Sequence, residues 1–150
     1  MMAAITAARA GKSVLLLEKL TKIGAKLKAT GGGRCNLTNT LSNEDFMARF
    51  GRDGRFMTPA LEALDYKALM RFFKEIGVES HAPDGYRVFP VTHSSLTIIK
   101  AMEDEMNHLG VNVLCSEKAE TLDHDGIKVT GVHTQTDMFH GDAVIIASGG

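Results

Sequence analysis

The sequence is poor in cysteine and contains no long apolar run. Its two cysteines, Cys35 and Cys115, stand far apart and form no Cys-x-x-Cys pair, which argues against a disulfide scaffold and fits a reducing compartment. None of the apolar runs approaches the roughly 20 residues that span a bilayer. The first residues also lack the charged-then-apolar order of a signal peptide. We therefore expect a cytoplasmic protein without a membrane segment.

An excess of charge of either sign is also absent. Seventeen Lys and Arg residues face eighteen Asp and Glu residues, for a net charge of -1. No global positive field therefore draws the protein onto nucleic acid or an acidic membrane, and any basic site must be local. RNA is a candidate partner, but one that the net charge does not indicate. The six histidines show no ligand spacing with one another or with the cysteines, so we expect no metal site.

The residues that are present predict an α/β fold. Hydrophobic residues make up 44% of the 150 residues, enough for the core of one ordinary domain. Helical spacing and short apolar runs alternate along the chain. The expected helices span residues 1–10, 44–50, 59–64, 65–78 and 94–109, the expected strands span residues 13–18, 111–116 and 143–147, a hairpin is expected within residues 81–93, and a small β-meander within residues 126–140. The strands at residues 13–18 and 143–147 are uninterrupted apolar runs, which is typical of parallel strands covered on both faces.

Glu18 ends the first of these strands. In dinucleotide-binding folds an acid at this place accepts hydrogen bonds from ribose hydroxyls, about 20 residues after a glycine-rich turn. Counting back that far from Glu18 passes Met1, so we expect the turn and the strand before it to lie upstream. The acid disfavours NADP, because a 2′-phosphate would meet like charge. The alternative is a solvated glutamate that ends a strand.

The segment TGGGRCN, residues 30–36, contains three consecutive glycines. Bare backbone of this kind is costly in conformational entropy, and it can present successive N–H groups to a phosphate or to flavin carbonyls. The segment follows the carboxyl end of a strand, where ligands of open α/β sheets bind. A local positive field comes from Lys22, Lys26, Lys28 and Arg34. The alternative is a flexible glycine loop with solubilising lysines.

Cys35 stands between Arg34 and Asn36. The neighbouring arginine could lower the pKa of the thiol, which would make Cys35 a nucleophile, an acid or a redox partner. The alternative is a small, packed side chain without chemistry.

Four features together carry a resemblance to a known family: Glu18, the block GGGRCNLTN at residues 31–39, YRVFP at residues 86–90, and the closing VIIASGG at residues 144–150. With these, the chain resembles the BaiN/YhiN-type family of flavoproteins over essentially its whole length. The resemblance implies an α/β, Rossmann-like FAD-binding domain with a parallel sheet and a small β-meander. It also implies FAD as the cofactor, with NAD(P)H as a candidate electron donor.

The resemblance also implies site residues. Those expected at the cofactor are Glu18, Lys19, Lys26, Gly31, Gly32, Gly33, Arg34, Ala119, Gly149 and Gly150. Separately from the resemblance, we hypothesise three roles in the chemistry: Arg34 stabilises negative charge at the flavin or substrate, Asn36 hydrogen-bonds to it, and Cys35 is a proton donor.

The chain departs from the family pattern at both ends. Family members begin with a strand and a Gly-x-Gly-x-x-Gly turn, and they continue into a substrate domain. Residues 1–150 are therefore expected to be a partial FAD-binding domain that alone binds FAD weakly or not at all and is inactive.

The expected function is hydride transfer through FAD in the intact parent. Family members have been associated with bile-acid reduction and with dihydrouridine formation in ribosomal RNA, so the substrate could be a steroid-like small molecule or an rRNA uridine. Two alternatives stay open: a non-redox phosphate- or RNA-binding module that uses the Lys/Gly-rich segment, and NAD binding at Glu18. The sequence indicates no oligomeric state.

Overall fold

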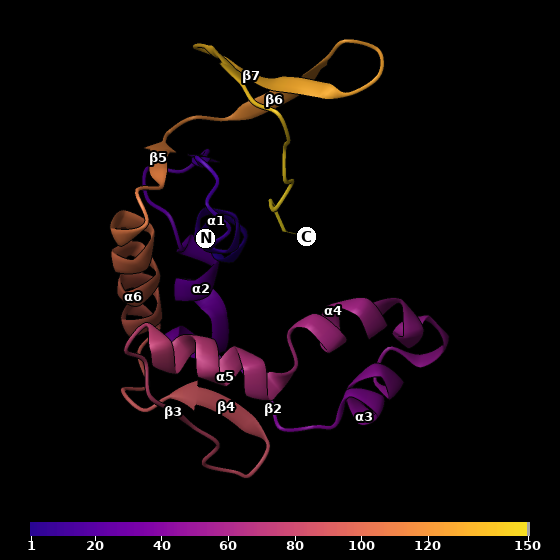
Figure 1. Cartoon of the computed structure of the whole chain (residues 1–150). Helices are drawn as coiled ribbons and strands as arrows, with labels where there is room; N and C mark the ends of the chain where they lie inside the picture. The colour runs from indigo at the N-terminus through magenta and orange to yellow at the C-terminus, as the bar shows by residue number, and fades with distance from the viewer. Residues whose placement is uncertain (150) are drawn as a thin grey trace. The chain divides into compact units, whose positions relative to one another are not determined.

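The computed structural model describes residues 1–149 and divides the chain into two compact units. The first unit comprises Met1–Ala25 with Met102–Gly150, and the second comprises Lys26–Ala101. Figure 1 follows the elements along the chain by colour. The helices are α1 (Met2–Arg9), α2 (Ala25–Ala29), η1 (Thr30–Gly33), α3 (Asn43–Ala48), η2 (Gly51–Met57), α4 (Thr58–Ala63), α5 (Tyr66–Glu75) and α6 (Ser95–His108), where η marks a 3-10 helix. The strands are β1 (Leu15–Glu18), β2 (Thr38–Asn39), β3 (Ser80–His81), β4 (Arg87–Pro90), β5 (Asn112–Cys115), β6 (Ala119–His124), β7 (Val129–Thr134) and β8 (Met138–His140).

A parallel strand pair lies in the first unit. β1 pairs with β5 in a register that places Leu16 opposite Val113 and Glu18 opposite Cys115. Helix α1 precedes β1 and ends where the sequence predicts, because Gly11 takes a left-handed φ of 74° just after the last turn. The parallel sheet and its leading helix are therefore confirmed.

Two expectations for the strands of this unit are wrong. Leu15 in β1 is 37% exposed, so β1 is not covered on both faces. The stretch Ala143–Ala147 forms no strand at all, and Ile145 and Ile146 are 64% and 73% exposed. An apolar run becomes a strand only when a neighbouring strand takes its backbone hydrogen bonds. Within residues 1–149, the β1–β5 pair does not take up this segment.

The expected meander is confirmed. β6, β7 and β8 form an antiparallel sheet in that order, with Val132 of β7 opposite Leu122 on one side and Phe139 on the other. Figure 1 shows β6 and β7 as a long hairpin near the carboxyl end of the chain.

The second unit contains a small antiparallel sheet in the order β2-β4-β3. The expected hairpin is β3 paired with β4, in which Ser80 lies opposite Pro90. β2 was not expected, because two residues are too short to show a sequence period. It pairs Thr38 with Val88 of the central strand. Val88 and Phe89 are buried, so β4 forms part of the core of this unit.

Two helices of the second unit, α3 and α5, begin at side-chain caps, whereas α4 begins without one and has a proline in its first turn. Ser42 Oγ accepts the N–H of Asp45 at 3.1 Å at the start of α3, and Asp65 Oδ1 accepts the N–H of Ala68 at 2.6 Å at the start of α5. Phe72 and Phe73 of α5 are buried. The expected helices α3, α4 and α5 are therefore confirmed. In the described part of the chain, no helix is long and apolar enough to cross a membrane.

A three-residue repeat in the sequence matches the 3-10 helix η2. Residues 49–57 read Arg-Phe-Gly, Arg-Asp-Gly, Arg-Phe-Met. Because a 3-10 helix has about three residues per turn, residues at the same position of successive triplets lie in one row along the helix. Gly54 of the third row is buried, and a Cβ there would overlap the carbonyl oxygen of Met47 in α3. This glycine therefore sets how closely η2 approaches α3.

Replacing Gly54 with Ala is expected to lower the free energy of unfolding by about 1–3 kcal/mol, since the added methyl group forces backbone apart. Urea denaturation measures the change. Gly141→Ala is the matched control, because a Cβ at Gly141 would lie at an ordinary 3.6 Å from its nearest neighbour. Equal stability of the two variants would contradict the close contact between η2 and α3.

Candidate functional site

Glu18 lies where the two parallel strands end. Its Oε1 accepts the N–H of Leu20 at 2.9 Å, and its carbonyl oxygen accepts the N–H of Glu117 at 2.9 Å. Ser116, with a φ of 60°, donates its N–H to the Leu20 carbonyl oxygen at 2.8 Å, so the chain segments beyond β1 and β5 are tied together. The carboxylate is thus held in place through one oxygen. Within residues 1–149, the other oxygen accepts no hydrogen bond, and the half-buried carboxylate also interacts electrostatically with the Met1 amino group.

Three other expected cofactor residues lie in the same unit as Glu18. Lys19 and Ala119 are exposed, and Ala119 is the first residue of β6. Gly149 is also exposed and has a φ of 77°. Gly150 lies outside the described residues.

The glycine run lies in the second unit and is not an open loop. Helix α2 continues directly into η1, so the interpretation as a flexible loop is wrong. Gly32 and Gly33 have φ values of 64° and 86°, which only glycine adopts without strain. Nothing lies within 4 Å of the place where a Cβ would stand at either residue. The backbone conformation, and not a crowded protein neighbour, requires the glycines.

The turn after the glycines alternates in hand. Gly33 and Cys35 have positive φ, with Cys35 at 58°, and Arg34 between them does not. An anion-binding nest, in which successive N–H groups point to one side, is built from alternating right- and left-handed residues. The expectation of a backbone donor surface in this segment stays a prediction.

The three residues that follow the glycines have different environments. Cys35 is 1% exposed, which suits a packed side chain. The side-chain nitrogen of Asn36, oriented to satisfy its neighbours, donates to the carbonyl oxygens of Thr38 at 2.9 Å and Val88 at 3.2 Å. Asn36 thus ties the turn to β2 and β4. Arg34 is exposed, and its guanidinium carbon lies 5.2 Å from the ring centroid of Phe89.

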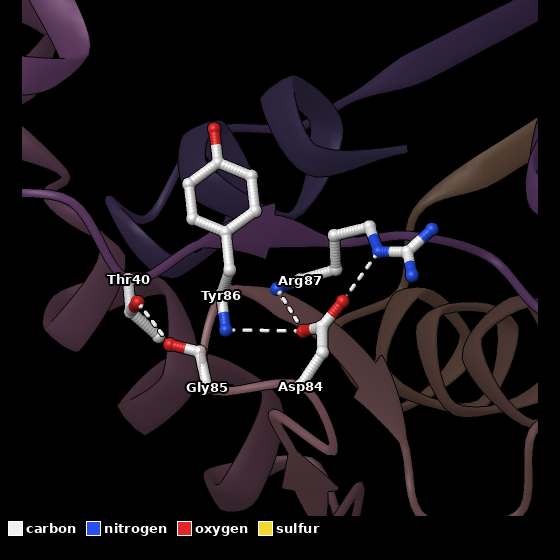
Figure 2. Close-up of polar contacts among 5 residues, drawn as sticks. All are labelled: Thr40, Asp84, Gly85, Tyr86 and Arg87. Atoms are coloured by element: carbon white, nitrogen blue, oxygen red, sulfur yellow. Dashed lines mark hydrogen bonds and ion pairs between the residues drawn. The ribbon is translucent and has the colours of Figure 1, made fainter.

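Asp84, which was not expected at the site, and Arg87, which the sequence showed only as part of the block at residues 86–90, form a hydrogen-bonded turn that leads into β4 (Figure 2). Asp84 Oδ1 accepts the N–H groups of Tyr86 at 3.0 Å and Arg87 at 2.7 Å, and Oδ2 accepts Arg87 Nε at 2.6 Å. Thr40 donates its hydroxyl to the Gly85 carbonyl oxygen at 2.8 Å. The Asp-x-x-Arg spacing within the Pro-Asp-Gly turn is the sequence signal that indicates this pair.

Hydrogen bonds from Arg87 and Tyr86 hold the pKa of Asp84 at about 2, well below its ordinary value. The bond from the Arg87 side chain contributes most. The carboxylate therefore stays charged at any physiological pH, and the turn keeps its acceptor.

Aromatic and histidine rings surround the same strand. His81 and His93 meet edge to face with centroids 4.8 Å apart, and the His93 ring lies 6.3 Å from Phe89. His81 Nε2 is buried and has no hydrogen-bond partner among the described residues. No group of three metal-ligating side chains occurs in the described part of the chain. A separate hollow of about 400 Å³, lined by residues 40–44 and 65–67, contains none of the expected residues.

The expected site residues thus divide between the two units. Glu18, Lys19, Ala119 and Gly149 lie in the first unit. Lys26, the glycine run and residues 34–36 lie in the second. Lys26 is an exposed residue of α2.

A helix followed by a parallel strand pair, with an acid at the carboxyl end of the first strand, defines a Rossmann-type dinucleotide-binding domain. The chain belongs to the family described as the HI0933-like protein Rossmann domain, whose sequence model matches residues 1–150. The family and the fold class expected from the sequence are therefore confirmed.

Similar proteins include a bile-acid reductase and a structurally characterised protein of low sequence identity. The 3-dehydro-bile acid delta(4,6)-reductase of Clostridium scindens is 31% identical over 150 residues, which are 99% of this chain and 36% of that protein. The chain thus spans about a third of the length of this relative. The crystal structure of Thermovibrio ammonificans THI4 aligns with a TM-score of 0.55 and 18% identity over 89% of this chain and 42% of that one, which supports the fold.

A thiol reagent such as dithionitrobenzoate is expected to react first with half-buried Cys115, because native packing shields Cys35. The absorbance of the released thionitrobenzoate anion follows the reaction. Cys115→Ser should remove the fast phase, whereas Cys35→Ala should retain it. A fast phase that disappears in Cys35→Ala would instead show a reactive thiol beside Arg34.

The low pKa of Asp84 also predicts a pH dependence. Its pKa in the folded state, about 2, lies below its ordinary value of 3.8, so ionised Asp84 stabilises the fold fully above about pH 4. This contribution is lost as the pH falls from 4 to 2. The stability difference between the native protein and Asp84→Asn should therefore shrink over that range in urea denaturation. Asp142→Asn, which alters an exposed carboxylate, should show no such change.

Proposed function

We propose that this chain is the FAD-binding domain of a flavin-dependent oxidoreductase. The observation that carries the proposal is Glu18, whose carboxylate is fixed by Leu20 at the carboxyl end of a parallel strand and keeps one oxygen for a ribose hydroxyl. Membership of a Rossmann-domain family and the likeness to a protein named as a reductase support a redox function.

The chain's residues fit a flavin nucleotide in two places. Glu18 offers an oriented acceptor for the hydroxyls of the adenosine half. The glycine run, whose residues Gly32 and Gly33 have positive φ and open space around the place of a Cβ, is the proposed place for phosphate or flavin carbonyl oxygens. FAD, when bound, supplies hydride transfer, and the protein supplies position and electrostatics. NAD(P)H is the proposed electron donor.

Arg34 is the residue that we propose to act on the reacting groups. It is exposed next to the alternating backbone, and its permanent charge would stabilise negative charge that develops on the flavin or substrate. Cys35 and Asn36 would shape this turn, since the thiol is buried and the amide nitrogen is used by Thr38 and Val88. A role for Cys35 as proton donor stays a prediction.

Because the chain spans 36% of the bile-acid reductase, the reaction of the whole protein is also a proposal. The name of that relative supports reduction of a small molecule with a steroid-like skeleton. We infer no RNA substrate from it.

Titration of the intact parent protein with FAD tests the proposal, because residues 1–150 alone are expected to bind FAD weakly or not at all. We expect saturable binding, and Glu18→Ala should weaken it about 10- to 100-fold, since a hydrogen bond to a charged group contributes about 1.5–3 kcal/mol. Glu62→Ala, which removes an exposed carboxylate from α4, is the control and should bind normally. Flavin absorbance and fluorescence quenching measure the binding. An intact parent protein that carries no flavin and takes none up would refute the proposed function.

A further inference from the structure

The guanidinium of Arg87 is held along one edge and open along the other (Figure 2). Its Nε donates to Asp84 Oδ2 at 2.6 Å, while its two terminal nitrogens donate no hydrogen bond to any residue in the described range 1–149. The side chain is 55% exposed. A planar fork with two parallel N–H groups therefore faces solvent in a defined orientation.

The turn around Arg87 is organised before any ligand arrives. Asp84 is itself fixed by the backbone N–H groups of Tyr86 and Arg87, and Thr40 holds the carbonyl oxygen of Gly85 between them. An arginine on a flexible loop loses much rotamer freedom when it binds a ligand. Here Asp84 has already imposed that restriction, which favours binding by pre-organisation.

A second cation shares the aromatic support of Arg87. The guanidinium carbons of Arg34 and Arg87 lie 5.2 and 6.0 Å from the centroid of the same Phe89 ring, although the two arginines come from separate segments. We call Arg34, Arg87 and Phe89 the arginine cluster. Asp84 pairs with Arg87 and orients its guanidinium, and the guanidinium of Arg34 lies against the same aromatic ring.

We propose that the arginine cluster binds an anionic group of the substrate that carries two oxygens on one atom, a carboxylate or a phosphate. The open edge of Arg87 matches the two oxygens of such a group in a bidentate arrangement, which a lysine at this position could not provide. This assignment rests on the proposed function, because it names the chemical class of substrate for the same second unit that holds Arg34. Arg87 anchors the substrate, and Arg34 lies toward the glycine turn.

Titrations with acetate, inorganic phosphate and chloride test the site directly, with the arginine Nε–H signals of the purified protein followed by NMR. We expect acetate or phosphate to shift the Arg87 signal saturably, and chloride to leave it nearly unchanged. Whichever of the first two anions binds more tightly identifies the group. Isothermal titration calorimetry with the same anion compares the variants: Arg87→Lys should weaken binding at least tenfold, whereas Arg71→Lys on α5 should have no effect.

Asp84→Asn separates pre-organisation from simple attraction. The substitution removes a negative charge beside Arg87, so attraction alone would strengthen anion binding. If the fork must be oriented, the variant should instead bind the anion several-fold more weakly. Tighter binding by Asp84→Asn, or equal shifts with chloride, would overturn the proposal.

FAD added to the same samples distinguishes this proposal from the previous one. If FAD displaces the anion from Arg87, the group bound there is a cofactor phosphate and the assignment to substrate is wrong. If FAD binds and the anion signal persists, both proposals are supported. A protein that binds the anion at Arg87 but takes up no flavin would retain the anion site and refute the flavin assignment.

Discussion

The parallel pairing of β1 with β5 is the interaction on which the functional interpretation depends. It aligns the carboxyl ends of two segments almost a hundred residues apart, and Ser116 and Glu117 then bond back to Leu20 and Glu18. Because of this closure, the Glu18 carboxylate projects from an ordered edge and not from a loose chain. Without the strand pairing, an acid after an apolar run would have no fixed position from which to bind a ligand.

The second unit uses a different device, a backbone forced into left-handed conformations. Gly32 and Gly33 adopt that conformation without steric strain because they have no Cβ. Cys35 adopts it too, although its Cβ makes a positive φ unfavourable. The side chains of the same turn divide the work: Cys35 is buried, Asn36 bonds to neighbouring strands, and Arg34 remains exposed over the edge of β4. One short segment thus combines anchoring with a charged, accessible group.

Much of this architecture could be predicted from the sequence. The helices, the hairpin and the meander follow from apolar spacing and from glycine and proline positions, which act over a few residues. The failures have a common cause. The run Ala143–Ala147 has the composition of a buried strand, but strand formation depends on a partner that a local pattern cannot supply. The Asp84–Arg87 pair escaped notice because a Pro-Asp-Gly turn has an adequate structural explanation without it.

The sequence by itself determined the family, the order of helices and strands, and the presence of Glu18 and the glycine run, since these depend on residue type and spacing along the chain. Only the tertiary structure decided that β1 pairs with β5, that the glycines continue a helix, and that Arg34 and Arg87 share one aromatic ring. These facts depend on contacts between segments far apart in the chain, and the energy of such contacts is not written in any local pattern.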